Sequence, residues 1–148
     1  MLRIRKFSVK DEDEFITMCC DFYNTGATLY DISRDKAKRS FDKIIEEGPY
    51  ITAYMLKYNE RIAGYVNLSF TYSNEADGMV AFIEELYVKP EYQGKSIGTQ
   101  TLQFIFEQYN SKVKRYRLEV CNSNTAAIRL YEKIGFKNLD YKQMVIDL

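Results

Sequence analysis

The chain of 148 residues contains no histidine, and this absence excludes several kinds of active site. Without histidine there is no Ser-His-Asp or Cys-His arrangement and no histidine-ligated zinc. Any general acid or base must therefore be Glu, Asp, Tyr, Cys or Lys. Tyrosine is abundant, with 13 residues, so a phenol is an available proton donor.

Cysteine is also scarce, tryptophan is absent, and no apolar run reaches the length of a membrane span. Of the three cysteines, Cys19 and Cys20 are adjacent on a predicted helix and Cys121 is distant, which is no disulfide framework. Helical packing explains the adjacent pair better than redox chemistry. The first residues alternate like a strand and lack the apolar core of a signal peptide. We therefore expect a reduced, cytoplasmic protein with no membrane partner.

Charge of one sign is not in excess, because 21 basic residues balance 21 acidic ones. A net charge of zero leaves no general electrostatic footprint for nucleic acid, so a nucleic-acid partner is not expected. The length suits one core, and no linker, repeat or low-complexity stretch divides the chain. We expect a single domain over residues 1–148.

Hydrophobic periodicity and turn signals predict the element order β-α-α-β-β-β-α-β-α-β-β. Ser8-Val9-Lys10-Asp11 fits a capping box at the start of the first helix. The expected strands are 2–7, 51–58, 61–72, 79–88, 116–120 and two within 136–147, and the expected later helices are 33–47, 98–109 and 124–134.

The segment between the strand that ends at Val88 and the helix after Gly98 is suited to hold an anion. Gln93-Gly94-Lys95-Ser96-Ile97-Gly98 is rich in small residues and in backbone N–H groups at a helix N-terminus. Such amides and the positive helix end converge on a pyrophosphate, and glycine lets a ligand approach the backbone. The pattern is neither a P-loop nor Gly-x-Gly-x-x-Gly.

This loop resembles the acyl-CoA-binding motif Gln/Arg-x-x-Gly-x-Gly/Ala of the GCN5-related N-acetyltransferase (GNAT) superfamily. About thirty residues later, the sequence resembles the family's late helix, Asn-x-x-Ala-x-x-x-Tyr-x-x-x-Gly-Phe. The matching residues of that helix are Asn124, Ala127, Tyr131, Gly135 and Phe136. Two independent motifs in the right order make a chance resemblance improbable.

The resemblance implies an α/β fold of the GNAT type, with a mixed, mostly antiparallel central sheet and helices on both faces. It implies acetyl-CoA as co-substrate and no metal. By resemblance, the Val88 N–H group bonds the thioester or pantetheine carbonyl and Asn124 bonds the pantetheine chain. The residues expected to bind the cofactor are Leu86, Val88, Gln93, Gly94, Lys95, Ser96, Ile97, Gly98, Thr99 and Asn124.

Transfer of an acetyl group to an amine needs a base, because only the neutral amine is a nucleophile. For an amine with a pKa near 10.4, deprotonation costs about 4–5 kcal/mol at neutral pH. Glu84 is the candidate base, since strand alternation places it with Phe82, Leu86 and Val88 and opposite Glu85. A solvated or ion-paired Glu84 is the structural alternative. Glu85 is the second candidate for this role, because a β-bulge would change which of the two glutamates faces the site.

Tyr131 is the candidate acid that protonates the leaving thiolate, as the resemblance implies. From periodicity alone it belongs to an apolar helix face with Ala127, Leu130 and Ile134, so a core role is the alternative. An acetyl-cysteine intermediate at Cys121 is the less favoured alternative to direct attack in a ternary complex.

Ser96 stands where the family usually has its middle glycine, and two readings are open. If its φ is positive, serine is strained there and Ser96→Gly should tighten binding of CoA. If its φ is negative, the hydroxyl can donate to a phosphate oxygen. The sequence favours the phosphate donor.

The acceptor is expected to be a small primary amine, such as a polyamine, an aminoglycoside or an amino acid. Residues 23–32 and 68–77 are expected to line its pocket, with Tyr23, Tyr30, Phe70 and Tyr72 as candidate side chains. The alternatives are a non-catalytic acyl-CoA-binding module and an acetyltransferase of a protein N-terminus or other macromolecule. A homodimer is also possible.

Overall fold

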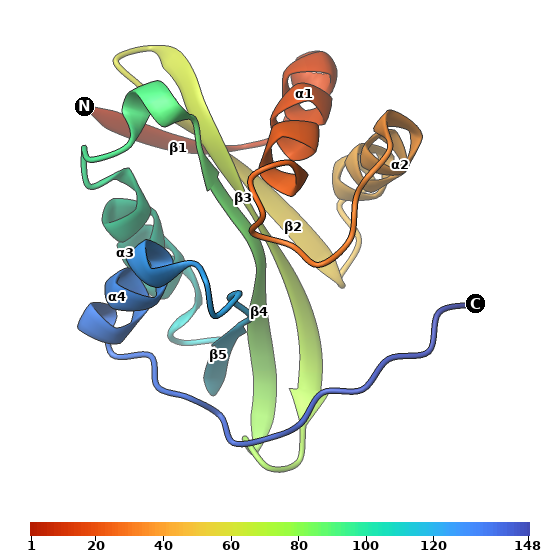
Figure 1. Ribbon diagram of the computed structural model, residues 1–148, viewed down its shortest axis with the longest axis vertical. Coiled ribbons are helices and arrows are strands. Elements are labelled where there is room, and N and C mark those ends of the chain that lie inside the picture. The colour runs from red at the N-terminus through yellow and green to blue at the C-terminus, as the bar shows by residue number, and fades with distance from the viewer.

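The computed structural model describes residues 1–148 and contains a central sheet with helices on both faces (Figure 1). Helices α1 and α2 cover one face, and α3 and α4 lie against the other. No helix combines the length and the apolar character that crossing a bilayer requires.

The elements follow the predicted order as far as the last helix. The strands are β1 (Leu2–Lys6), β2 (Ile51–Tyr58), β3 (Arg61–Ser73), β4 (Gly78–Val88) and β5 (Arg115–Leu118). The α-helices are α1 (Glu12–Tyr23), α2 (Arg34–Ile45), α3 (Ile97–Tyr109) and α4 (Thr125–Ile134), and short 3-10 turns span Val9–Asp11 and Pro90–Tyr92. The predicted capping box is present, with the Asp11 carboxylate accepting the Ser8 backbone N–H at 2.7 Å.

The sheet has the strand order β1-β2-β3-β4-β5. The first four strands are antiparallel neighbours, and β5 pairs with β4 in parallel. The expectation of a mixed, mostly antiparallel sheet with helices on both faces is confirmed. The β4–β5 ladder spans only Val80–Ile83 and Arg115–Leu118, so the second half of β4 has no neighbour on that side.

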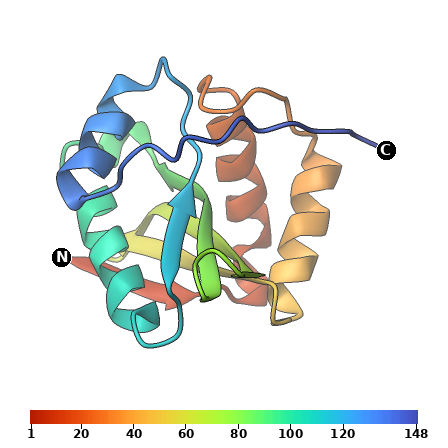
Figure 2. The same ribbon diagram turned by 90° about the horizontal axis from the view of Figure 1, so that it is seen from below.

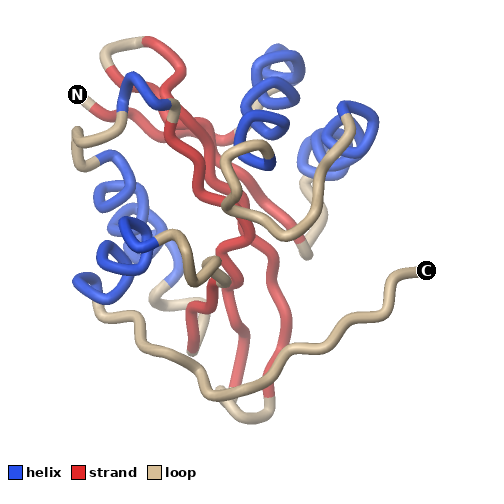
Figure 3. The backbone as a smooth tube through the Cα atoms, viewed as in Figure 1, coloured by secondary structure: helices blue, strands red, loops and turns tan.

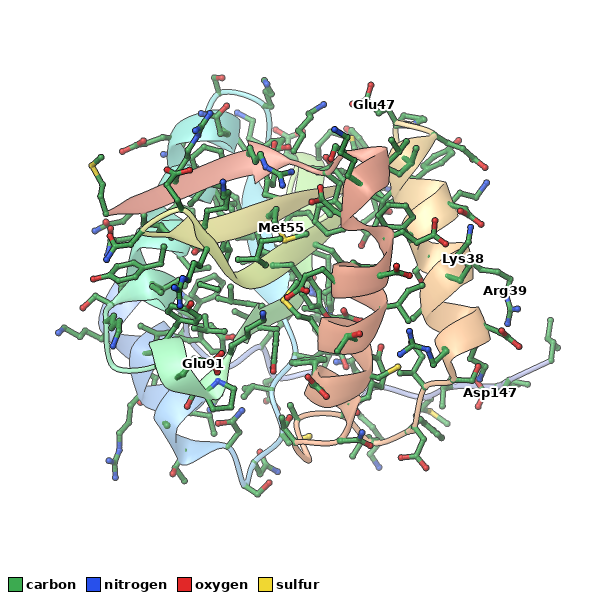
Figure 4. All side chains as sticks on the ribbon, turned by 90° about the horizontal axis from the view of Figure 1, so that it is seen from above. Lys38, Arg39, Glu47, Met55, Glu91 and Asp147 are labelled. Atoms are coloured by element: carbon green, nitrogen blue, oxygen red, sulfur yellow. The ribbon has the colours of Figure 1, made fainter.

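The sheet separates two apolar cores. The core under α1 and α2 is centred on fully buried Phe15, Met55 and Tyr65, whereas the core under α3 contains Leu68 and Leu102. Figure 4 shows Met55 in the middle of the molecule, with Lys38 and Arg39 pointing outward from α2. Which core a side chain joins therefore identifies the face of the sheet that it occupies.

A β-bulge interrupts β4 at its two adjacent glutamates. The cross-strand pairs run Leu68 with Ile83 and then Asn67 with Glu85, so Glu84 has no partner in β3. The extra residue in one strand is the definition of a bulge, and it shifts the alternation of side chains that follow it.

The bulge places Glu84 and Glu85 on the same face of the sheet. Ile83 before the bulge and Leu86 after it both pack into the core under α3, so the two residues between them face α1. Alternation had placed Glu84 with Leu86 and Val88, opposite Glu85, and that prediction is wrong. One additional residue in the ladder is enough to move the following side chains of a strand to the other face of the sheet.

The two strands expected within 136–147 are not formed, so that prediction is also wrong. After α4 the chain is extended without a ladder and crosses the open end of the molecule (Figures 2 and 3). The Tyr141 hydroxyl donates to Glu75 at 2.5 Å, and beyond it Met144 and Ile146 are 90% and 88% exposed. The apolar alternation is present, but a strand also needs a partner for its backbone groups.

Candidate functional site

A cleft of about 730 Å³ lies where the second half of β4 has no neighbouring strand. It is bounded by the α1–α2 connection, β4, the loop before α3, and α4. Its lining residues are Phe22, Thr25, Gly26, Ala27, Leu86, Tyr87, Val88, Tyr92, Gln93, Gly94, Ser96, Ile97, Gly98, Thr99, Ser123, Asn124, Ala126, Ala127, Leu130 and Tyr131.

The backbone of β4 is open toward this cleft. The Lys89 N–H bonds the Ala63 carbonyl of β3, and residues of an antiparallel strand alternate in the side to which their backbone groups point. Leu86 and Val88 therefore direct their backbone groups away from β3, to the side where β5 has already ended. The Val88 carbonyl accepts the Gln93 side-chain amide at 3.1 Å. The Val88 N–H is left to bind a ligand.

The loop before α3 presents a row of free amides. The backbone N–H groups of residues 94–99 donate no backbone hydrogen bond. Hydrogen bonding of α3 begins at Gln100, whose N–H donates to the Ser96 carbonyl. Gly94 has φ +76°, a conformation that side chains disfavour. Free amides at a helix N-terminus attract phosphate oxygens, so the geometry of the loop is suited to a pyrophosphate.

Helix α4 completes the cleft from the other side. A Cβ on Gly98 would lie 3.1 Å from Leu130 Cδ2, so the glycine allows α3 and α4 to approach closely. Asn124 caps α4 by accepting the Ala127 N–H at 3.3 Å. Its side-chain oxygen is therefore used inside the protein, and its NH₂ group is the part that can bond a ligand in the cleft.

Ser96 adopts the left-handed conformation, with φ 59° and ψ 20°. The phosphate-donor reading required a negative φ, so its premise is contradicted. A non-glycine residue in this region carries about 1 kcal/mol of strain or more. The side chain also makes no capping hydrogen bond to α3 that would compensate.

We expect Ser96→Gly to tighten CoA binding or leave it unchanged, and to raise the melting temperature, because glycine relieves this strain. Calorimetric titration with CoA and thermal unfolding measure the two effects. Ser123→Gly is the matched control: Ser123 also lines the cleft, but its φ is not positive, so glycine there should only add flexibility. Weaker CoA binding by Ser96→Gly would contradict the strain argument.

Tyr131 lies at the boundary between the core and the cleft. Its ring packs edge-on against Phe136, with centroids 5.8 Å apart, while the residue also lines the cleft. Burial raises the pKa of its phenol, so Tyr131 stays protonated at neutral pH. The core and acid roles proposed from the sequence are therefore compatible in one side chain.

Glu85 is a partly buried carboxylate on β4, next to the cleft but outside its lining. Its oxygens accept hydrogen bonds from the hydroxyls of Tyr23, at 2.9 Å, and Tyr65, at 2.6 Å. Burial raises the pKa of Glu85, the two phenols oppose the shift, and nearby Glu84 adds to it. Glu84 itself is exposed and accepts only the Ser69 hydroxyl, at 2.6 Å.

Most of the predicted site residues come together in the cleft. Ten of them line it: Leu86, Val88, Gln93, Gly94, Ser96, Ile97, Gly98, Thr99, Asn124 and Tyr131. Lys95 and Glu84 lie outside the lining. Lys95 belongs to the loop but is exposed, and Glu84 lies on β4 beyond Tyr87, on the α1 side.

The predicted acceptor aromatics separate into different environments. Tyr23 faces the site, through its bond to Glu85. Phe70 instead packs on Tyr109 at the α3 face, with ring centroids 5.2 Å apart, and Tyr30 and Tyr72 are mostly exposed. Phe70 therefore has a packing role.

Sequence reasoning missed Asn67 and Tyr65, which meet Glu85 from β3. Tyr65 is fully buried, and Asn67 is only 6% exposed with its side-chain oxygen unpaired. A polar Asn within the apolar run of β3 was the available signal. Its meaning depends on the residue opposite, which only the ladder register identifies.

A family comparison matches this geometry. The sequence model described as "Acetyltransferase (GNAT) family" matches residues 16–136, which include both glutamates, the amide loop and α4. The chain belongs to this family. The resemblance noted in two short motifs thus extends over most of this chain.

Among the sequence relatives is thialysine N-epsilon-acetyltransferase of Mus musculus, which is 33% identical over 79 residues. The match covers 53% of this chain and 46% of the mouse protein. The chain therefore spans about half the length of that relative.

Solved structures share the fold at lower identity. A possible acetyltransferase from Clostridium difficile 630 has a TM-score of 0.85 at 16% identity, covering 100% of this chain and 98% of its own. The aminoglycoside N-acetyltransferase AAC(6′)-Iy, solved with a CoA-containing bisubstrate analog, has a TM-score of 0.81 at 13% identity and covers 100% and 99%. These likenesses establish the fold.

Proposed function

We propose that this protein transfers the acetyl group of acetyl-CoA to the primary amine of a small molecule, by direct attack in a ternary complex. The observation that carries the proposal is the partly buried Glu85 carboxylate, two residues along β4 from Tyr87 in the cleft wall. It places a proton acceptor beside a cleft that is otherwise suited to CoA. The names of the mouse relative and of AAC(6′)-Iy are consistent with small amines as acceptors.

The cleft's own residues fit CoA. The free amides of residues 94–99 would hold its pyrophosphate, and Asn124 and the open backbone of Leu86 and Val88 would hold its pantetheine arm. When bound, acetyl-CoA supplies the acetyl group and a thiolate leaving group. Gly94 adds no side chain to the loop, so the pyrophosphate can approach the backbone there.

Glu85 accepts the proton that the amine must lose, directly or through a water molecule. The best general base has a pKa close to the working pH, and the raised pKa of Glu85 brings it closer than an ordinary glutamate. The prediction that Glu84 is the base stays untested. We give Glu84, which is exposed, the role of attracting the positively charged acceptor.

Val88 and Tyr131 act on the other side of the reaction. As the amine nitrogen forms its bond to the acetyl carbon, the Val88 N–H donates to the carbonyl oxygen, where negative charge develops. As the carbon–sulfur bond breaks, Tyr131 donates its phenolic proton to the sulfur. The cleft thus offers a donor for each atom that becomes negative.

Transfer is tested by mixing the protein with acetyl-CoA and a panel of small amines, and following release of the free thiol. The expected result is amine-dependent release, with the acetylated amine identified by mass spectrometry. Thiol release at the same rate with and without every amine would mean that the protein only hydrolyses acetyl-CoA. The absence of thiol release with any amine would favour the non-catalytic acyl-CoA-binding module.

We expect acetyl-CoA to stabilise the folded protein, because the amide loop and α4 form the cleft only when folded. At about one hundred times its dissociation constant, a ligand adds roughly 2.7 kcal/mol to the free energy of unfolding. For a domain of this size, the melting temperature should rise by several degrees. An unchanged melting curve at saturating acetyl-CoA would contradict the cofactor assignment.

A further inference from the structure

We propose that residues 142–148 pair as a strand with the free edge of β5 in a second copy of the chain, so that two copies exchange their C-terminal segments. Two features of the structure carry this inference: an apolar segment that is exposed, and a strand edge that has no neighbour. Because both belong to the same chain, the exchange is reciprocal about a two-fold axis.

The segment that follows Tyr141 is apolar and exposed. The side chains of Met144 and Ile146 are 90% and 88% exposed, and Val145 between them is 67% exposed. Residues 142–148 make no backbone hydrogen bond, either as donors or as acceptors. Exposed apolar side chains in a row mark an interaction surface, and the unpaired backbone beside them can form a ladder with another strand.

Strand β5 offers an edge to which this segment can bind. It is the last strand in the order of the sheet and pairs only with β4. No backbone group of Arg115–Leu118 makes a hydrogen bond outside that ladder. An open edge accepts an added strand through main-chain hydrogen bonds, and side chains on the two faces then select the partner.

The segment leads away from the β5 edge of its own chain. The Tyr141 hydroxyl donates to Glu75 in the turn between β3 and β4, which holds the start of the segment at the open end of the sheet. Beyond this contact the chain runs toward α2, whereas β5 lies on the side of α3 and α4, and both views agree (Figures 1 and 2). A second copy can bring its β5 to the segment without breaking the Tyr141 contact.

The two faces of β5 differ in character. Tyr116 and Leu118 pack in the core under α3. Alternation therefore places Arg115 and Arg117 on the opposite face. Arg115 forms an ion pair with Glu75, whereas Arg117 forms none. The strand thus presents one apolar face and one face with an unpaired cation.

The alternation of the C-terminal segment fits both of these faces at once. In an extended chain Met144 and Ile146 lie on one face and Asp147 on the other. When the two apolar side chains continue the apolar face of β5, Asp147 lies on the face of Arg117. Asp147 has no ion pair within its own chain. Opposite charges on neighbouring strands stabilise the pairing, and the apolar side chains leave water.

Association is measured by sedimentation equilibrium of the full chain over a range of concentrations. We expect wild type to dimerise, and the double variant Met144→Lys/Ile146→Lys to dimerise at least about tenfold more weakly, because it loses the apolar contact. Both side chains are exposed in the single chain, so its fold does not depend on them.

Val9→Lys is the matched control for the double variant. Val9 is an exposed apolar residue of the 3-10 turn before α1, and its replacement should leave dimerisation unchanged. A wild-type protein that is monomeric at every concentration would overturn the proposal. A double variant that dimerises as strongly as wild type would also overturn it.

Arg117→Glu tests which charges face each other. It should weaken dimerisation about tenfold, because it places a like charge beside Asp147. Adding Asp147→Arg to the same chain should restore dimerisation, since the two charges are then exchanged across the pairing. A purely local effect of Arg117→Glu on β5 would not be reversed by a change at Asp147. Failure of the second substitution to restore dimerisation would overturn the pairing of these faces.

Isotope mixing distinguishes exchange from a segment that folds back onto its own β5. Unlabelled protein and protein labelled with heavy nitrogen are mixed, left to exchange subunits, and treated with an amine-reactive cross-linker. Lys142 begins the segment and Lys114 directly precedes β5, and both are exposed. Exchange predicts cross-links between these lysines that join a light and a heavy peptide, identified by mass spectrometry. Cross-links within one isotope only, or none between the two lysines, would overturn the proposal.

Discussion

Tyr131→Phe is expected to lower turnover by roughly 10- to 10³-fold, while the affinity for acetyl-CoA stays nearly unchanged. The variant keeps the ring that packs on Phe136 and loses only the hydroxyl at the cleft. Since burial raises the pKa of this phenol, the wild-type group carries its proton at neutral pH and can give it to the departing sulfur. Steady-state kinetics and calorimetry with CoA measure the two quantities.

Tyr92→Phe is the matched control for this experiment. Tyr92 also lines the cleft and packs edge-on against Tyr58, but its hydroxyl has no proposed role in the chemistry. It should therefore keep most of the turnover. If Tyr131→Phe turns over like wild type, with chemistry shown to be rate-limiting, Tyr131 is a core residue only.

Glu85→Gln is expected to remove the acidic limb of the pH–rate profile and to slow amines of high pKa most. Wild-type activity should fall as the pH drops through the raised pKa of Glu85, so this limb lies above the range of an ordinary glutamate. Glutamine keeps the size of the side chain but accepts no proton. A general base typically contributes roughly 10²- to 10⁴-fold to the rate. A weakly basic amine already arrives neutral, so its rate should fall by less than this factor in Glu85→Gln.

The comparison with Glu84→Gln decides between the two glutamates. That variant should keep the acidic limb, because its carboxylate is exposed and attracts substrate without taking the proton. If Glu84→Gln loses the limb and Glu85→Gln keeps it, the base is Glu84, as the sequence first suggested. An equal loss across amines of different pKa would assign Glu85 to positioning.

The same pKa shift should make the free energy of unfolding of the wild-type protein depend on pH, and Glu85→Gln should remove this dependence. Because the pKa of Glu85 is raised in the folded state, the folded protein binds more protons than the unfolded one between the ordinary and the raised pKa. The free energy of unfolding therefore decreases as the pH rises through that interval. Denaturant unfolding at several pH values should show this slope in wild type and lose it in Glu85→Gln.

The helices, the first five strands and the residues of the α3 loop and α4 that line the cleft could be predicted from the sequence, because their signals are local. Gly94, Gly98 and the amides between them lie in one short stretch that leads into an amphipathic helix. Asn124 and Tyr131 are seven residues apart on a single helix, so their placement follows from helical geometry.

The placement of the two glutamates was decided by tertiary structure, because it depends on pairing between strands far apart in the chain. Nothing local to Ile83-Glu84-Glu85-Leu86 shows that β3 skips Glu84, yet that single offset turns both glutamates toward α1. It also sets Asn67 opposite Glu85 and brings in Tyr23 from α1. The backbone conformation of Ser96 and the unpaired C-terminal segment likewise follow from contacts that periodicity does not contain. The sequence alone determined the loop of free amides and the helix that border the cleft, whereas strand register determined that Glu85 is the more buried of the two adjacent glutamates.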